Sequence, residues 1–369
     1  MKGIILAISF SFIADSKSVL NFLNSLCTGS SANNCEEIAK MIGKRRRILR
    51  DFIRILERII IKTFVKIRNL IPGRLNFAIQ GLIYFLYFVT FFYIKDSSFS
   101  PQTIVCLVAL SFLLLTNYAL LHEAAHGNFH KNPRLNYLGG ILSGFLFPIS
   151  FTLVQVTHSK HHAYNRTIYE SFDLISKSDH RMVKYFQWYS ILLGFFWPSA
   201  VLGNLLVAFF PNARNWKIFQ NRLSTKVMLE DLQPSDIPKI RWETAGILIL
   251  WSLIFYIGLM EPMAIFILYF LFGINWSTRQ YITHAYTERK VIEGAFNLKT
   301  SRWHELLLLN GNWDREHHEY PEFPWIFLSK LGKKRKADRS YLKQYLKMWL
   351  GPISTDEAPP LPLPVHRNF

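Results

Sequence analysis

Histidines gather in four short stretches of this 369-residue chain. The sequence LLHEAAHGNFH places two of them four residues apart, which puts both imidazoles on one face of a helix. The sequences HSKHH and DREHH repeat spacings of three and four residues, and RQYITH adds one more imidazole. The candidate metal ligands are therefore His122, His126, His158, His161, His162, His284, His317, His318 and the carboxylate of Asp314.

Eight imidazoles are more than one metal ion needs. Zinc sites take three or four protein ligands, so this number predicts two metal ions. Imidazole also suits iron, where open coordination positions allow chemistry with O2. The first cluster alone, HEAAH, has the HExxH pattern of zinc hydrolases, with Glu123 as the general base. An intramembrane zinc protease is therefore a rival interpretation.

The three clusters together resemble the histidine boxes of the membrane fatty acid desaturase and hydroxylase family. Its members carry boxes close to HxxxH, HxxHH and HxxHH, and this chain has HEAAH, HSKHH and DREHHEYPEFPW, with NGNW ahead of the third. The resemblance covers roughly residues 70 to 330. It implies that the histidines of these clusters bind a di-iron centre on the cytoplasmic face.

Two positions depart from the family pattern. Asp314 replaces the first histidine of the third box, and Thr283 stands where relatives often have Glu. The carboxylate of Asp314 would either bind iron or leave one site a ligand short. Either change would shift the reactivity or indicate lost activity, so a catalytically inactive lipid-binding or scaffold protein is a third interpretation.

The resemblance implies an O2-dependent oxidase, in the first place a fatty acid desaturase that introduces a double bond into a long acyl chain of a membrane lipid. A lipid or carotenoid hydroxylase or ketolase of the same family is the alternative. Two iron ions and O2 are implied, with electrons from a separate cytochrome or ferredoxin. The three cysteines form no iron–sulfur motif and we find no GxGxxG nucleotide fingerprint, so the electrons must come from another protein.

The composition indicates that membrane elements hold these ligands. Half of the residues are hydrophobic and the mean hydropathy is +0.14, yet the formal charge is +18. A soluble nucleic-acid-binding protein would not normally combine this charge with 31 Phe, 16 Tyr and 10 Trp. We therefore expect an integral membrane protein and no nucleic-acid partner.

Two hairpins are long and apolar enough to cross a bilayer. Segments 77–94 and 104–121, each of 18 residues, predict the first. Segments 244–260 and 262–276, separated by a Glu-Pro pair, predict the second. Eleven Lys and Arg residues between positions 43 and 74 place the N-terminal region in the cytoplasm.

Two further apolar segments, 135–156 and 188–210, contain Pro148 and Pro198. Boxes that share a metal centre must lie on one membrane face, and the 31 residues between the first and second boxes are too few for two crossings. Both segments are therefore predicted to be interfacial or re-entrant. The fold class that results is an all-α integral membrane protein with about four transmembrane helices in two hairpins, interfacial helices and a cytoplasmic histidine-rich cap.

Three regions follow from this organisation. Residues 1–75 form a basic amphipathic region, residues 76–330 a membrane desaturase-like domain, and residues 331–369 a basic, then proline-rich tail. Both termini are predicted to be cytoplasmic. Residues 1–16 resemble a short signal peptide, although its use would export the basic segment against the charge rule.

Two other histidines are weaker ligand candidates. His130 follows the first box by four residues and would extend its helical face. His304 lies close enough to Asp314 in the sequence to replace the missing histidine of the third box.

Overall fold

The computed structural model describes residues 67–94, 100–217, 223–258, 260–333 and 337–365. Nearly all of them belong to one compact unit, Leu70–Phe369. The leader-like residues, almost all of the predicted basic amphipathic region and the last residues of the tail lie outside the described residues. The described part is mostly helical, with two short pairs of strands, which agrees with the predicted helical class.

The first predicted hairpin is confirmed as α3 (Gly73–Ile94) and α4 (Pro101–Ala125). Both helices are long and apolar enough to cross a membrane. The Ser100 side chain accepts a backbone hydrogen bond at the start of α4, where proline occupies the first turn. Apolar side chains such as Phe92, which is 79% exposed, cover the outside of α3. Helix α4 is buried along most of its length, so it is fixed in position where it carries the first box.

The second predicted hairpin forms α11 (Asp236–Tyr256) and α12 (Pro262–Ile282). By length and composition, α3 and α4 are the only unbroken described helices that qualify as spans. Charged residues in the first turns of α11 and polar residues up to Arg279 at the end of α12 lower the hydropathy of both. Their middle turns expose apolar side chains, including Ile249 at 68% and Phe266 at 67%. The second hairpin exists, while its passage through the membrane stays a prediction.

Two helix pairs are sharply bent. Helices α5 (Pro133–Leu146) and α6 (Phe151–Tyr164) meet at 97°, with Pro148 in the break, where the sequence predicts an interruption. Helices α7 (Arg181–Leu192) and α8 (Phe196–Phe209) meet at 94°. Each pair is either one broken span or a re-entrant loop, so the described residues contain two to four candidate spans.

The second bend does not lie at the proline of segment 188–210. Pro198 is in the first turn of α8, and the chain turns at Gly194, whose φ is +87°. A β-carbon on Gly194 would lie 2.7 Å from the backbone nitrogen of Ile274. The turn therefore requires glycine both for its positive φ and for the close approach of α12.

Buried polar side chains hold the bent pairs in place. Glu243 of α11 accepts hydrogen bonds from the backbone N–H of Thr152 at 2.8 Å and from the hydroxyls of Thr152 and Tyr137. Asn204 of α8 accepts a hydrogen bond from the backbone N–H of Ser150 at 3.1 Å. These contacts hold the start of α6 at the bend, more than one helical turn before His158.

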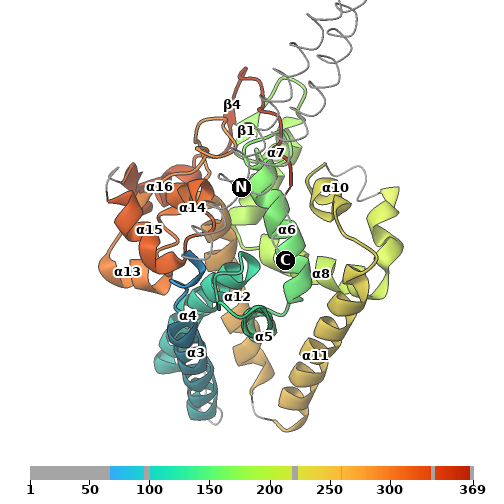
Figure 1. Cartoon of the computed structure of the whole chain (residues 1–369), viewed down its shortest axis with the longest axis vertical. Coiled ribbons are helices and arrows are strands. Elements are labelled where there is room, and N and C mark those ends of the chain that lie inside the picture. Colours follow the sequence, from blue (N-terminus) through green and yellow to red (C-terminus); the bar gives the residue numbers. More distant parts are fainter. Residues whose placement is uncertain (1–66, 95–99, 218–222, 259, 334–336, 366–369) are drawn as a thin grey trace, which may run out of the picture. The chain divides into compact units, whose positions relative to one another are not determined.

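The remaining elements lie mainly at the histidine-bearing end of the unit. In Figure 1 the hairpins α3–α4 and α11–α12 run toward the lower edge, while the later helices and the strands lie above them. Parallel strand pairs β1–β4 and β2–β3 tie distant segments together. These elements are β1 (Leu174–Ile175), η1 (Pro211–Asn215), α10 (Leu223–Glu230), β2 (Leu298–Lys299), α13 (Arg302–Leu307), α14 (Asp314–Glu319), α15 (Trp325–Gly332), β3 (Arg339–Ser340), α16 (Tyr341–Met348) and β4 (Ile353–Ser354).

Candidate metal centre

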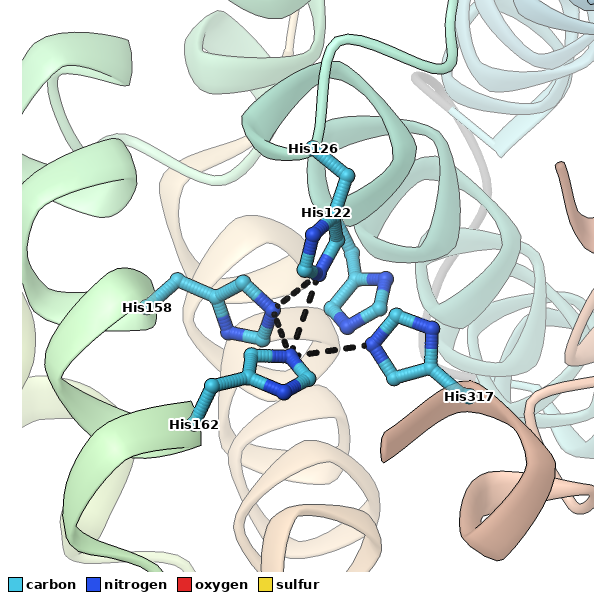
Figure 2. A group of neighbouring side chains, drawn as sticks. All are labelled: His122, His126, His158, His162 and His317. Carbon is cyan, nitrogen blue, oxygen red and sulfur yellow. Dashed lines mark hydrogen bonds between the residues drawn. The ribbon is translucent and has the colours of Figure 1, made fainter. Parts of the chain in front are cut away.

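Five histidines from three elements form the first group (Figure 2). Helix α4 contributes two at its C-terminal end, α6 contributes two that lie one turn apart, and α14 contributes one. One nitrogen from each ring lies within 4.8 Å of the others. The fold thus brings together residues that are far apart in the sequence: His122, His126, His158, His162 and His317.

The ring nitrogens of this group face one another at short range. The Nε2 atom of His162 lies 3.2 Å from that of His126, 3.1 Å from that of His158 and 3.1 Å from that of His317 (Figure 2). The Nε2 atoms of His126 and His158 are 2.6 Å apart.

This arrangement fits a metal ion better than hydrogen bonds between the rings. Three ring nitrogens in a triangle cannot alternate donors and acceptors, so at least one pair would face like to like. Nitrogen ligands at about 2.0–2.1 Å from one ion lie roughly 3 Å from each other. The five imidazoles of the first group therefore form a suitable set of donors for one ion.

A second group lies beside the first. It contains His161 of α6, His284 just after α12 and His318 of α14, again with ligand atoms within 4.8 Å of one another. The rings of His162 and His318, one from each group, have centroids 4.4 Å apart. The Oδ2 atom of Asp314 lies 3.2 Å from Nε2 of His284 and 3.9 Å from Nε2 of His318. The carboxylate therefore lies beside two of the three imidazoles of the second group.

Both departures from the family pattern meet at this point. The hydroxyl of Thr283 donates a hydrogen bond to Oδ2 of Asp314 at 2.7 Å, and both residues are buried. Burial alone would raise the pKa of Asp314, but a hydrogen bond from Nε2 of His284, whose proton a bound metal ion would replace, holds this pKa well below its ordinary value. Asp314 is therefore ionised and has the charge of an anionic ligand.

Burial has the opposite effect on imidazoles. Removal from water lowers the pKa values of His317 and His318 well below the ordinary value of histidine. Both rings are neutral near pH 7, which is the form that binds metal.

Two ligands of the second group are also held at the nitrogen that faces away from it. Nδ1 of His284 lies 3.1 Å from the carbonyl oxygen of Gly294, and Nδ1 of His161 lies 2.7 Å from the carboxylate of Glu170. Each contact keeps a proton on Nδ1 and leaves Nε2 for a metal. The sequence analysis missed Glu170 and Gly294. In the sequence, Glu170 is marked only by being an acidic residue eight positions after the second box. This position does not reveal which histidine it contacts.

The two weaker histidine candidates lie outside both groups. His130 accepts a hydrogen bond at Nδ1 from the backbone of Asn132, and His304 hydrogen-bonds to Thr300 and packs against Tyr341. The suggestions that His130 extends the ligand face and that His304 compensates for the third box are therefore wrong. Local contacts in the loops and helix ends orient both rings.

Glu123, the base of the rival protease interpretation, has a packing role. Its Oε2 atom accepts a hydrogen bond from the backbone N–H of Trp325 at 3.0 Å, which ties α15 to α4. It also borders, with His122 and His317, a cavity of about 20 Å³ that has room for one water molecule.

Comparison with known proteins decides the family. A model of the fatty acid desaturase family matches residues 98–351, well over half of the chain. The chain belongs to this family. A comparison with curated proteins finds no match.

Family membership confirms the resemblance seen in the histidine boxes. The matched region contains every histidine of both groups, and it makes the protein a member of an oxidoreductase family of desaturases and hydroxylases. The apolar helices α3 and α4, together with the family, indicate an integral membrane protein.

Proposed function

We propose that this protein is an O2-dependent di-iron desaturase that introduces a double bond into a long acyl chain of a membrane lipid. The observation that carries the proposal is the pair of adjacent histidine groups. A hydrolytic zinc site needs one such group. Two adjacent groups rich in imidazole fit two iron ions that act together.

The five imidazoles of the first group would hold one iron. The second iron would be held by the second group, namely His161, His284 and His318 with Asp314. Bound iron would supply the activation of O2 and the removal of hydrogen from an unactivated C–H bond. The side chains themselves would position the two ions and exclude bulk water.

The cavity beside His122 and His317 is lined mainly by apolar side chains such as Leu115 and Leu308. An acyl chain that reached the first histidine group on this side would contact these apolar side chains.

Desaturation takes two electrons from the acyl chain, whereas reduction of O2 to two waters takes four. The other two electrons must come from a donor. We propose a separate cytochrome or ferredoxin, which would dock on the basic cytoplasmic surface.

Charge supports a cytoplasmic histidine face. Lys95 is the only Lys or Arg between Arg74 and Lys131, and no Lys or Arg lies between Arg241 and Arg279. The far ends of both hairpins therefore carry almost no positive charge, as the positive-inside rule expects of a non-cytoplasmic side. We propose that both histidine groups and both termini are cytoplasmic.

A hydroxylase or ketolase would use the same metal centre and is the alternative within the family. The product separates these functions. Expression in a host followed by mass spectrometry of its lipids should show acyl chains lighter by two hydrogens. A gain of one oxygen would indicate the hydroxylase or ketolase.

A His161→Ala variant serves as the control for this experiment. Purified wild-type protein should also contain about two irons per chain. One zinc per chain would support the protease, and a chain without metal would support the scaffold.

A further inference from the structure

Glu170 is a buried carboxylate that lies outside both histidine groups. It is 6% exposed, and its Oε2 atom lies 2.7 Å from Nδ1 of His161. A carboxylate in such a place is costly unless a donor pairs with it. Building on the proposed di-iron function, we propose that Glu170 is the positioning residue of His161 and sets the affinity of the second iron site.

The second box is divided between the two groups. His158 and His162 belong to the first group, whereas His161 belongs to the second. A histidine on a helical turn can rotate about its side-chain bonds, so its position on α6 does not by itself direct the ring. The hydrogen bond to Glu170 fixes both the orientation of the His161 ring and the proton on Nδ1. It also makes Nε2 a stronger donor to a metal, because the carboxylate increases the electron density of the ring.

Glu170 is itself held by a buried polar network. Arg166 and Asp173, both fully buried, form an ion pair at 2.7 Å. The Tyr281 hydroxyl lies 2.8 Å from Oδ1 of Asp173 and 3.0 Å from the carbonyl oxygen of Glu170. Tyr281 is three residues before His284, so one network positions the segments that carry two ligands of the same site.

Glu243 provides a matched control. It is also a glutamate that is 6% exposed, and it accepts hydrogen bonds from Thr152 and Tyr137. Neither partner is a histidine. A substitution of Glu243 therefore reports the general effect of removing a buried carboxylate from this fold.

The experiment uses the full-length protein in detergent, loaded with ⁵⁷Fe²⁺. Iron content is measured against increasing concentrations of a chelator, and Mössbauer spectra distinguish the two sites. We expect Glu170→Ala to weaken the binding affinity of the second site for iron by about 10- to 100-fold. Glu170→Gln, which keeps the shape and an acceptor oxygen but loses the charge, should weaken it less. Glu243→Gln should keep both irons.

A double-mutant cycle separates positioning from general stability. Titration with excess Fe²⁺ measures the weakened second site of His161→Ala, and adding Glu170→Ala should not lower its affinity further, because the residue through which Glu170 acts is already absent. A full additional loss would mean that Glu170 acts elsewhere. Melting temperatures of all variants identify any that fail to fold, and the isosteric Glu170→Gln variant then carries the test.

The outcomes distinguish the two proposals. Wild-type protein that takes up fewer than two irons overturns both the di-iron function and the role of Glu170. Wild-type protein with two irons, and both Glu170 variants holding them equally tightly, overturns the role of Glu170 alone.

Discussion

The two histidine groups use the same side chain in different ways. The first gathers five imidazoles whose ε nitrogens converge, and the buried Nδ1 atom of its His317 has no hydrogen-bond partner among the described residues. The second gathers three imidazoles and adds the carboxylate of Asp314. Two of its rings, His161 and His284, are held at Nδ1 by an oxygen acceptor.

The first group therefore offers more imidazoles, whereas the second offers fewer but has two of them held in orientation at Nδ1. The first group still has four donors when one is lost, which is enough to hold a metal ion. A site with fewer donors depends on each of them and on the groups that orient them. The carboxylate also makes the second site harder and more anionic than the first, which favours higher oxidation states of iron. We therefore expect the two irons to differ in both affinity and redox behaviour.

The largest effect should follow from His162→Ala. This ring belongs to the first group, where its Nε2 atom contacts three others, and it packs 4.4 Å from His318 of the second. The first site would lose the ring at the centre of its contacts and the second would lose the ring that packs against His318, so iron should fall below two per chain and lipid product to background. Metal analysis and lipid profiling of the same preparation measure this. Retention of two irons would contradict the central place given to this residue.

A paired comparison of His284→Ala with His122→Ala tests the tolerance of each group. Loss of His284 leaves the second site with two imidazoles and one carboxylate, so one iron of two should be lost. Loss of His122 leaves four imidazoles in the first group, so both irons should remain, with reduced activity. Iron titration of the two variants checks this order, and equal losses would remove the distinction between the groups.

Asp314→Asn tests the anionic ligand. Loss of the charge should lower the affinity of the second site for iron. The decrease should exceed the roughly 10- to 100-fold that follows from loss of a residue that only hydrogen-bonds to a ligand. Asp314→His restores the usual third box and should keep two irons. If Asp314→Asn holds iron as tightly as the wild type, the carboxylate is not a ligand.

Much of this site could be predicted from the sequence. The spacing of four residues in HEAAH, and of three and four in HSKHH, is set by the helical period, so these patterns identify ligands before the fold is known. Which ligand belongs to which ion could not be predicted. His161 and His162 are adjacent in the chain and lie in different groups, because successive residues of a helix point about 100° apart.

Some parts of the fold could likewise be predicted from the sequence, and others could not. Continuous apolar runs predicted α3 and α4, because burial in lipid acts on every residue of such a segment. The bend at Gly194 could not be predicted, since it depends on the approach of Ile274 from a helix far along the chain. The contact between Glu170 and His161 likewise depends on the buried network around Asp173.

Glu123→Gln should have a smaller effect, confined to stability. The amide oxygen of Gln can still accept the backbone N–H of Trp325 and the side chain keeps its shape, so we expect a loss of no more than about 1 kcal/mol. A lowered Tm in detergent measures it. Both irons and the lipid product should persist, because neither histidine group includes this residue. A protease that uses HEAAH would instead lose its activity with its metal retained.

The smallest effect should follow from His304→Ala. His304 is the histidine nearest in sequence to Asp314 outside the third box, yet its ring hydrogen-bonds to Thr300 and packs against Tyr341. Its loss should leave two irons per chain and unchanged Mössbauer spectra. If the second iron were lost, His304 would have to reach that site, and the assignment of Asp314 as its fourth donor would be wrong. His304 and Asp314 are only ten residues apart in the sequence, but their side chains contact different residues. This variant therefore tests whether a histidine close in sequence to the third box also lies close to the metal site.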